Sequence, residues 1–208
     1  MPVLNEAPGI RAALEALAPL RARGHEVIVV DGGSSDGTPA LAAGRCDRVV
    51  SAPRGRALQM NAGAQIATGE VLIFLHADTR LPFEFNIPAS LWGRFDVKIE
   101  GRHPLLKVVA CGMNTRSRLT GIATGDQAMF VRRDAFPGFP AIALMEDVAL
   151  SKALKRRARP ACLREKVVTS GRRWESRGVL RTIVLMWKLR LLYFFGARPE
   201  ELARRYYG

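Results

Sequence analysis

The chain lacks the features of a secreted, membrane-spanning or disulfide-stabilised protein. Its three cysteines are far apart and include no CxxC pair, so we expect reduced thiols rather than disulfides or a zinc site. No apolar run reaches the roughly 18–20 residues that a transmembrane helix needs. The sequence opens without the basic start and apolar core of a signal peptide. We therefore expect a cytoplasmic protein.

Two nucleotide-binding signatures are also missing. No G-x-G-x-x-G follows a predicted strand, which argues against a dinucleotide-dependent oxidoreductase. Residues 2–11 contain no glycine-rich loop with a lysine, as a nucleotidyltransferase would usually have after its first strand. With 208 residues, 48% of them apolar, the chain is long enough for one domain with a hydrophobic core.

Acidic residues are in the minority. Nineteen Asp and Glu face 32 Lys and Arg, which gives a formal charge of +13. Such a surface attracts nucleic acid, anionic lipid or a phosphorylated substrate. The basic residues lack the interleaved aromatics of single-strand binders, so no nucleic-acid partner is expected. A non-catalytic basic protein that binds nucleic acid or an anionic membrane surface stays the alternative to an enzyme.

The first half of the chain alternates strand and helix patterns, which is typical of a parallel sheet. Predicted strands cover residues 2–4, 27–30, 48–51 and 70–76, and predicted helices cover 5–24, 38–44 and 56–67. Asp31 follows the second strand and Asp78 follows the fourth. Ligands of open α/β sheets bind beyond the carboxyl ends of the strands. These acids are therefore candidate ligand contacts.

The second half is less regular. Residues 93–99 alternate like an edge or antiparallel strand. Further strands are predicted at 128–131 and 162–168, and helices at 105–119, 146–157 and 179–195. The fold class is α/β, with a Rossmann-like, mostly parallel sheet, flanking helices and a mixed second half.

Arg54, Gly55 and Arg56 precede a predicted helix that also carries Asn61. Two guanidiniums at a helix start suit a diphosphate, because bidentate donors and helix amides both favour anions. A solvated basic turn is the alternative.

His76 and Asp78 lie two residues apart after a buried strand, so both side chains can aim at one point. They are candidate ligands for Mg²⁺ or Mn²⁺, since Mg²⁺ binds few protein oxygens plus substrate phosphates. Glu146 and Asp147 begin a helix, and a carboxylate there could act as a general base. Acids that simply stabilise the helix dipole are the alternative.

Four stretches together resemble the family 2 glycosyltransferases of the GT-A fold, and they keep that family's order. They are EVIVVDGGSSDGT, NAGAQIATGEVLIFLHADT, GDQAMFVRRDAF and MEDVALSKALKR, and the chain also contains GRRW at 171–174 as in a short bacterial subgroup. The resemblance implies an enzyme that moves a sugar from a nucleoside-diphosphate sugar with inversion.

The resemblance also implies roles for individual residues. Asp147 with Glu146 would be catalytic, Asp78 would end the metal-binding DxD motif, and Gln127 would lie along the acceptor or donor sugar. The implied donor contacts are Leu4, Asn5, Glu6, Asp31, Gly125 and Asp126, and Arg172, Arg173 and Trp174 match part of the QxxRW string of processive relatives.

Three positions depart from the family pattern. His76 replaces the first acid of DxD, Gly32 replaces the second acid often found after Asp31, and Ser170 stands where processive enzymes have Gln. The last departure argues against a polysaccharide synthase.

The predicted helix at 179–195 is apolar on most sides and carries Trp187 and Tyr193. Such a helix is buried in the core, in a homodimer interface or in a membrane surface. A membrane role would place the protein at the inner face of the membrane and would suggest a lipid-linked acceptor. We predict a catalytic domain at 1–178, with a nucleotide-binding half at 1–81 and an acceptor-side half at 82–178, followed by a helical appendage at 179–208.

Overall fold

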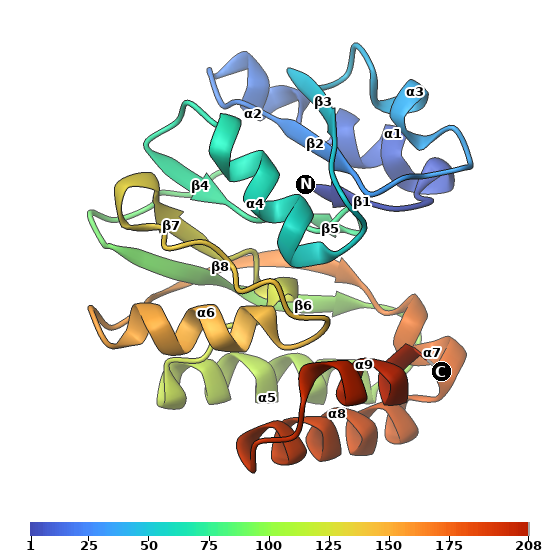
Figure 1. The fold of residues 1–208 in the computed structure, drawn as a ribbon, viewed down its shortest axis with the longest axis vertical. Helices are drawn as coiled ribbons and strands as arrows, with labels where there is room; N and C mark the ends of the chain where they lie inside the picture. Colours follow the sequence, from blue (N-terminus) through green and yellow to red (C-terminus); the bar gives the residue numbers. More distant parts are fainter. Residues whose placement is uncertain (208) are drawn as a thin grey trace.

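The computed structural model describes residues 1–207 and contains two sheets flanked by helices (Figure 1). In the first sheet three parallel strands lie in the order β1-β2-β3. They are β1 (Pro2–Val3), β2 (Ile28–Asp31) and β3 (Arg48–Ser51). The helices are α1 (Ala7–Glu15), α2 (Ala18–Ala22), α3 (Thr38–Ala42) and α4 (Arg56–Ile66). The predicted alternation of strand and helix is confirmed.

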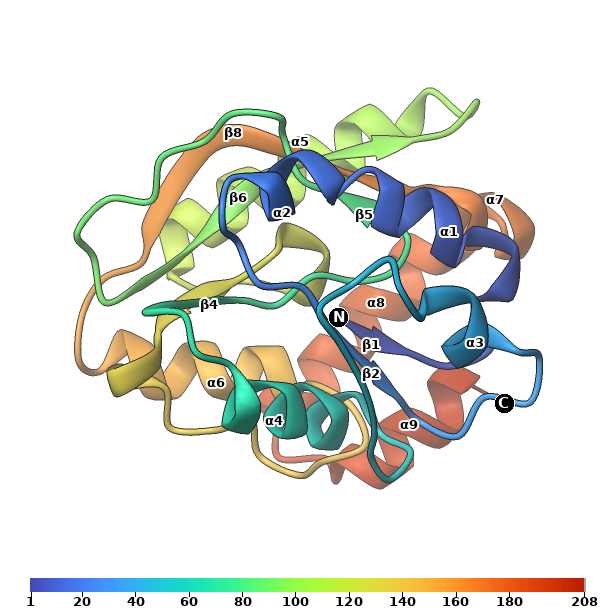
Figure 2. The same cartoon turned by 90° about the horizontal axis from the view of Figure 1, so that it is seen from above.

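The central strand β2 is covered on both faces. Val29 is fully buried in one cluster with Ile10 and Leu14 of α1. Val30 faces α4, where a Cβ on Gly63 would lie 3.0 Å from the Val30 Cγ2 atom. Figure 2 accordingly shows α1 and α4 on opposite sides of this sheet. The continuous apolar run in the sequence thus reflects burial on both faces.

The single helix predicted over residues 5–24 is divided into α1 and α2. Pro19 lies in the first turn of α2. A proline ring clashes with the carbonyl four residues earlier, here that of Glu15, where α1 ends. The proline therefore explains the break.

The second sheet has five strands in the order β4-β7-β6-β8-β5. They are β4 (Val71–Ile73), β5 (Thr79–Arg80), β6 (Trp92–Glu100), β7 (Phe130–Arg132) and β8 (Ala161–Ser170). β6 runs parallel to β8, whereas β4, β7 and β6 pair antiparallel. The mixed character expected for the second half is confirmed.

Residues 93–99 are predicted to form an edge or an antiparallel strand, and the second alternative holds: β6 pairs antiparallel with β7 and lies inside the sheet, between β7 and β8. Two of its polar residues are buried and paired, whereas Lys98 is exposed: Arg94 is fully buried against Asp96, and Arg118 donates to Asp96 at 2.7 Å. At Arg94 and Asp96 the alternation of polar and apolar residues therefore marks an internal ion-pair network, and at Lys98 it marks a solvent-facing side.

The remaining helices lie beside the second sheet, away from the first (Figure 1). They are α5 (Leu105–Thr120), α6 (Glu146–Lys155), α7 (Arg172–Arg177), α8 (Val179–Phe194) and α9 (Pro199–Tyr207). Leu189 of α8 and Leu202 of α9 are fully buried in one cluster with Leu144, Met145 and Val148. Among residues 1–207, no helix is both long and apolar enough to cross a bilayer.

Candidate functional site

Asp31 follows β2, and its carboxylate holds the loop that comes next. Oδ2 accepts hydrogen bonds from the N–H groups of Gly33 and Ser34, both at 3.0 Å, and Oδ1 accepts one from the Ser34 hydroxyl. Asp31 is only 4% exposed. It therefore shapes the crevice loop, and the contact with a base or ribose implied by the resemblance stays a prediction.

The turn after β1 is tied to the same loop. Half-buried Leu4 is followed by Asn5, whose backbone is left-handed at φ 55°. The Asn5 Oδ1 atom accepts from the Ser35 N–H at 2.9 Å, and the Glu6 N–H donates to the Thr38 hydroxyl at 2.8 Å. The turn after β1 and the loop after β2, both predicted to line the nucleotide pocket, are therefore joined by hydrogen bonds into one edge.

Gln59 of α4 is a structural residue of this edge that the sequence analysis missed. Its Nε2 atom donates to the carbonyls of Val3 and Val30, both at 2.8 Å, so it joins the ends of β1 and β2. A Cβ on Gly32 would lie 2.9 Å from the Gln59 Cδ atom. The glycine in place of the family's second acid therefore makes room for Gln59.

Asp78, Arg172 and Arg173 lie within electrostatic range of Glu6. The Ser170 N–H donates to the Asp78 carbonyl at 3.1 Å, which places the end of β8, just before the two arginines, beside Asp78. Burial, and then the charge of Asp78, raise the pKa of Glu6, while Arg172 and Arg173 oppose that rise. The Asp78 carboxylate itself accepts a bond from the Thr79 hydroxyl at 3.3 Å. The structure thus brings two predicted acids and two predicted arginines to one edge of the fold.

His76 is engaged with Asp126. Its Nδ1 atom lies 3.4 Å from the Asp126 Oδ1 atom, and its buried Nε2 atom has no hydrogen-bond partner among the described residues. A Cβ on Gly125 would be 2.5 Å from the imidazole, so only glycine fits there. Burial alone would raise the pKa of the Asp126 carboxyl. The hydrogen bond and charge of His76, together with the charge of Arg56, have the larger combined effect, so this pKa is lowered.

Glu146 and Asp147 begin α6 after Met145, a non-glycine residue with a left-handed φ of 70°. Glu146 is 3% exposed, and its Oε1 atom lies 3.2 Å from the Arg56 Nη1 atom. Burial, and then Asp147, raise the pKa of Glu146. Burial alone would lower the pKa of the Arg56 guanidinium. The charges of Glu146 and other anionic groups have the larger combined effect, so this pKa is raised.

Asp147 is held by backbone amides. Its Oδ2 atom accepts from the Gly125 N–H at 2.9 Å and its Oδ1 atom from the Val148 N–H at 2.7 Å. The space enclosed by Asp147, His76, Arg56 and their neighbours is about 10 Å³, too small for a sugar. A substrate must therefore approach Asp147 from outside this cavity.

Two of the predicted site residues make hydrogen bonds to other segments of the protein. Gln127 is fully buried, and its Nε2 atom donates to the Ser117 hydroxyl and the Asn114 Oδ1 atom at 3.1 and 3.3 Å. Asn61 donates to the carbonyl of Phe139 and accepts from its N–H, both at 2.8 Å. Both amides therefore stabilise neighbouring segments, and their contact with a ligand stays a prediction. The sequence could not reveal this, because their partners lie in other elements.

The remaining predicted residues, Arg54, Arg173 and Trp174, lie before α4 and on α7. Arg54 is exposed before α4, and Trp174 of α7 packs against the main core. The Arg173 Nη1 atom donates to the Tyr206 hydroxyl at 2.9 Å, and Arg177 donates to the Tyr206 carbonyl at 2.8 Å. These bonds attach α9 to α7 beside the charged edge.

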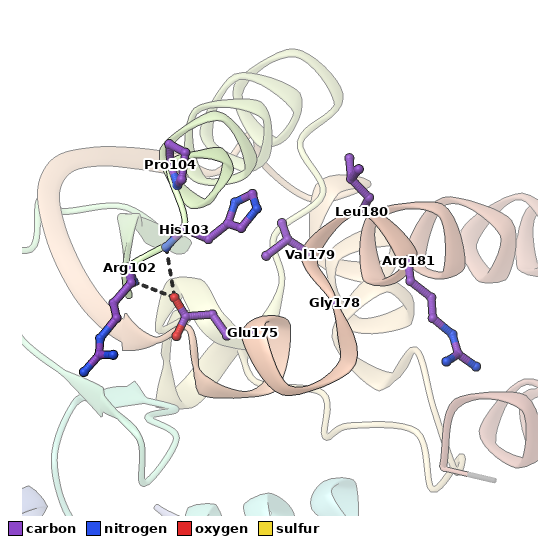
Figure 3. Close-up of a pocket in the computed structure, with 8 residues that line it drawn as sticks. All are labelled: Arg102, His103, Pro104, Glu175, Gly178, Val179, Leu180 and Arg181. Atoms are coloured by element: carbon purple, nitrogen blue, oxygen red, sulfur yellow. Dashed lines mark hydrogen bonds between the residues drawn. The ribbon is translucent and has the colours of Figure 1, made fainter.

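A larger groove of about 610 Å³ lies elsewhere, between the start of α5 and the junction of α7 and α8 (Figure 3). Its lining includes Arg102, His103, Val179 and Arg181, none of them a predicted site residue. The Glu175 Oε1 atom accepts from the N–H groups of Arg102 and His103, at 2.5 and 3.0 Å. These two bonds join residues that line the groove, and none of its lining residues is Glu6, Asp78, Arg172 or Arg173.

Residues 1–88 match the family model described as glycosyl transferase family 2. No curated protein sequence matches the chain. A mannosyltransferase from Pyrobaculum calidifontis, in complex with GDP-Man and Mn²⁺, is 20% identical with a TM-score of 0.63 over 98% of this chain and 66% of that one. Glucosyl-3-phosphoglycerate synthase from Mycobacterium tuberculosis, in complex with Mn²⁺ and UDP-glucose, is 16% identical with a TM-score of 0.56 over 79% and 67%.

Mannosyl-3-phosphoglycerate synthase from Rubrobacter xylanophilus is 19% identical with a TM-score of 0.51 over 94% of this chain and 73% of that one. The chain spans about two thirds of the length of the first structures it matches. These likenesses confirm the predicted fold class, and the family model confirms the resemblance for residues 1–88.

Proposed function

We propose that this chain is an inverting glycosyltransferase that moves a sugar from a nucleoside-diphosphate sugar to a hydroxyl, carboxyl or phosphate acceptor. The main observation that supports this proposal is that Asp78, Arg172 and Arg173 come close to Glu6 from segments far apart in the sequence. Such an edge, with carboxylates beside guanidiniums, suits a diphosphate held partly through a cation. The solved structures of the same fold that contain UDP-glucose or GDP-Man support this.

Asp147 is the proposed base. The acceptor oxygen attacks the anomeric carbon of the sugar opposite the diphosphate, and a new carbon–oxygen bond forms as the bond to the diphosphate oxygen breaks. The acceptor proton passes to Asp147, and the electron pair leaves with the nucleoside diphosphate. The two amides that hold Asp147 fix its direction, which such a proton transfer requires.

The diphosphate is proposed to lie against Arg172 and Arg173, with Arg54 and Arg56 towards the start of α4. Arg56 is fixed by Glu146, so its charge is positioned before the substrate arrives. Glu146 therefore acts as a positioning residue rather than as a second base.

A divalent cation fits Asp78 better than His76. Glu6 and Asp78 are two like charges near one another, whereas His76 is turned to Asp126. Among residues 1–207, no three His, Cys, Asp or Glu side chains form a metal-binding group. The donor set thus suits Mg²⁺ or Mn²⁺ shared with substrate phosphates. When bound, such a cation would neutralise charge on the leaving diphosphate.

Calorimetric titration with nucleoside diphosphates and turnover of a nucleotide sugar test these roles. We expect Asp147→Asn to lower turnover by roughly 10²–10⁴-fold with nearly unchanged nucleotide affinity. Asp78→Ala should weaken nucleotide binding in the presence of Mg²⁺ or Mn²⁺. Full turnover by Asp147→Asn, or unchanged affinity in Asp78→Ala, would remove the corresponding role.

We further propose that α8 contacts an anionic membrane surface. Its solvent side carries a row of exposed apolar residues at helical spacing: Leu180, Val184, Trp187, Leu191 and Phe194. Arg181 and Lys188 on the same helix are exposed and suit anionic headgroups. A lipid-linked acceptor would then be available at this face.

Co-sedimentation with vesicles of mixed phosphatidylserine and phosphatidylcholine tests this contact. Trp187→Ala with Phe194→Ala should reduce binding, whereas Leu119→Ala, exposed at the end of α5, should not. Absence of binding at low salt would refute the membrane contact. A concentration-dependent dimer that the same pair of changes dissociates would assign the row to a homodimer interface.

A further inference from the structure

Arg116 of α5 and Arg190 of α8 are partly buried without partners. The Arg116 Nη2 and Arg190 Nε atoms are inaccessible to solvent and make no hydrogen bond among the described residues. Over residues 1–207, neither side chain belongs to an ion pair within 4.0 Å. Desolvating a cation without a partner is costly, so this arrangement calls for an explanation.

The two guanidiniums lie near each other and near Asp147. Burial, and then the charge of Arg190, lower the pKa of Arg116 to about 10, and Asp147 acts in the opposite direction. Burial lowers the pKa of Arg190, and Asp147 and Asp126 oppose that shift.

The packing agrees with this: Leu189, next to Arg190, is buried with Met145 and Val148, which flank Asp147. Ser117, next to Arg116, accepts a hydrogen bond from Gln127 in the segment whose Gly125 N–H donates to Asp147. Helices α5 and α8 are in contact (Figure 1).

Two other arginines of this layer, buried Arg94 and exposed Arg118, are paired. Arg94 and Arg118 both contact Asp96. A carboxylate partner is thus present for these two arginines, which have a structural role. Asp147 forms no ion pair within 4.0 Å with either Arg116 or Arg190 over residues 1–207, and its oxygens accept the N–H groups of Gly125 and Val148. The pair thus has unused donors next to the proposed base.

We propose that Arg116 and Arg190 bind a phosphate group of the acceptor, whose reacting oxygen then lies at Asp147. This inference rests on the proposed function. Two planar guanidinium forks offer the donors and charge that a phosphate dianion requires. Each side chain keeps an accessible part through which a ligand can reach it. The acceptor is therefore a phosphate ester, either a soluble molecule or a lipid with a phosphate headgroup.

The test uses the full chain, with glycerol 3-phosphate and vesicles containing phosphatidic acid as separate probes. Binding is measured by calorimetry and co-sedimentation, with and without a nucleoside diphosphate and Mg²⁺. The variants are Arg116→Gln and Arg190→Gln, with Arg11→Gln as the matched control, because Arg11 is exposed on α1. We expect each site variant to bind at least one probe about ten- to a hundredfold more weakly, since charged hydrogen bonds are lost, and the control to be unchanged.

A loss confined to glycerol 3-phosphate supports a soluble ester, and a loss confined to vesicles supports a lipid headgroup. Equal binding of both probes by all variants overturns the site, as does a loss of nucleoside diphosphate binding alone. If a glutamine variant does not fold, Arg116→Lys and Arg190→Lys replace it. They keep the charge without the fork, and undiminished affinity in them also overturns the proposal. Failure of the unmodified chain to bind any nucleoside diphosphate counts against the proposed function instead.

Discussion

Gln59 and Gly32 should be energetically coupled, because the Gln59 side chain occupies the space where a residue 32 side chain would begin. Gln59→Ala removes two buried hydrogen bonds of 2.8 Å that join β1 to β2. Each is worth about 0.5–1.5 kcal/mol, and the two carbonyls lose a buried donor. We therefore expect a loss of about 2–4 kcal/mol, or roughly 4–16 °C in melting temperature for a domain of this size.

Gly32→Ala should be destabilising by about 1–3 kcal/mol in the unmodified chain, since its Cβ would lie 2.9 Å from the Gln59 Cδ atom. In the Gln59→Ala background that atom is absent, so the same change should cost much less. Gly9→Ala is the control, because nothing lies within 4 Å of its Cβ on α1.

Thermal and urea unfolding of the two single variants and the double variant form a mutant cycle. Additive effects within about 0.3–0.5 kcal/mol would refute the steric account of Gly32. Nucleoside diphosphate affinity should fall in Gln59→Ala as well, because the strand ends it joins form the proposed pocket.

The other predictions concern a contact at the site and one remote from it. Gly125→Ala should abolish turnover while the protein stays folded by circular dichroism, because its Cβ would meet His76 at 2.5 Å and displace the amide that holds Asp147; normal turnover would contradict this. Asp47 accepts bonds from Arg21 and from the Val27 N–H, which lower the pKa of its carboxyl. The stability that Asp47 provides is therefore present above the unfolded pKa of about 3.9 and is lost as the pH falls through the lower folded value. Asp47→Asn should thus be less stable than the unmodified chain at pH 7 and approach it below about pH 4, as urea unfolding at several pH values would show; a pH-independent difference would refute the linkage.

Local sequence patterns predicted much of the fold. The β-branched run before Asp31 and the glycines that follow gave a buried strand and a crevice loop, because strand burial and turn chemistry are encoded within a few residues. The starts of α4, α5, α6 and α8 agree with the predicted ones. Residues 93–99 could be predicted only as an edge or an antiparallel strand; they form a strand inside the sheet, antiparallel to β7, where Asp96 is neutralised by Arg94 and by Arg118 of α5. A pattern along one strand contains no information about such a partner.

The same limit applies to the candidate site. Acids after strands and at a helix start could be recognised as chemically apt, and the structure places Asp78, Glu6 and two arginines together. The sequence could not show that the side-chain amides of Gln127 and Asn61 donate hydrogen bonds to neighbouring segments. Nor could it single out Gln59, Arg116 or Arg190, whose significance depends on which elements pack around them.

The C-terminal helices take part in this arrangement. Met145, directly before the Glu146–Asp147 pair, has a left-handed backbone, which costs a residue with a side chain about 1–3 kcal/mol. Its side chain is buried with Leu189 of α8 and Leu202 of α9. Burial of a methionine side chain provides about 1.5–3 kcal/mol, which is enough to offset that strain. The boundary at residue 179 stays a prediction, but the helices beyond it stabilise the backbone that orients Asp147. The position of the proposed base therefore depends on residues more than 40 positions later in the chain.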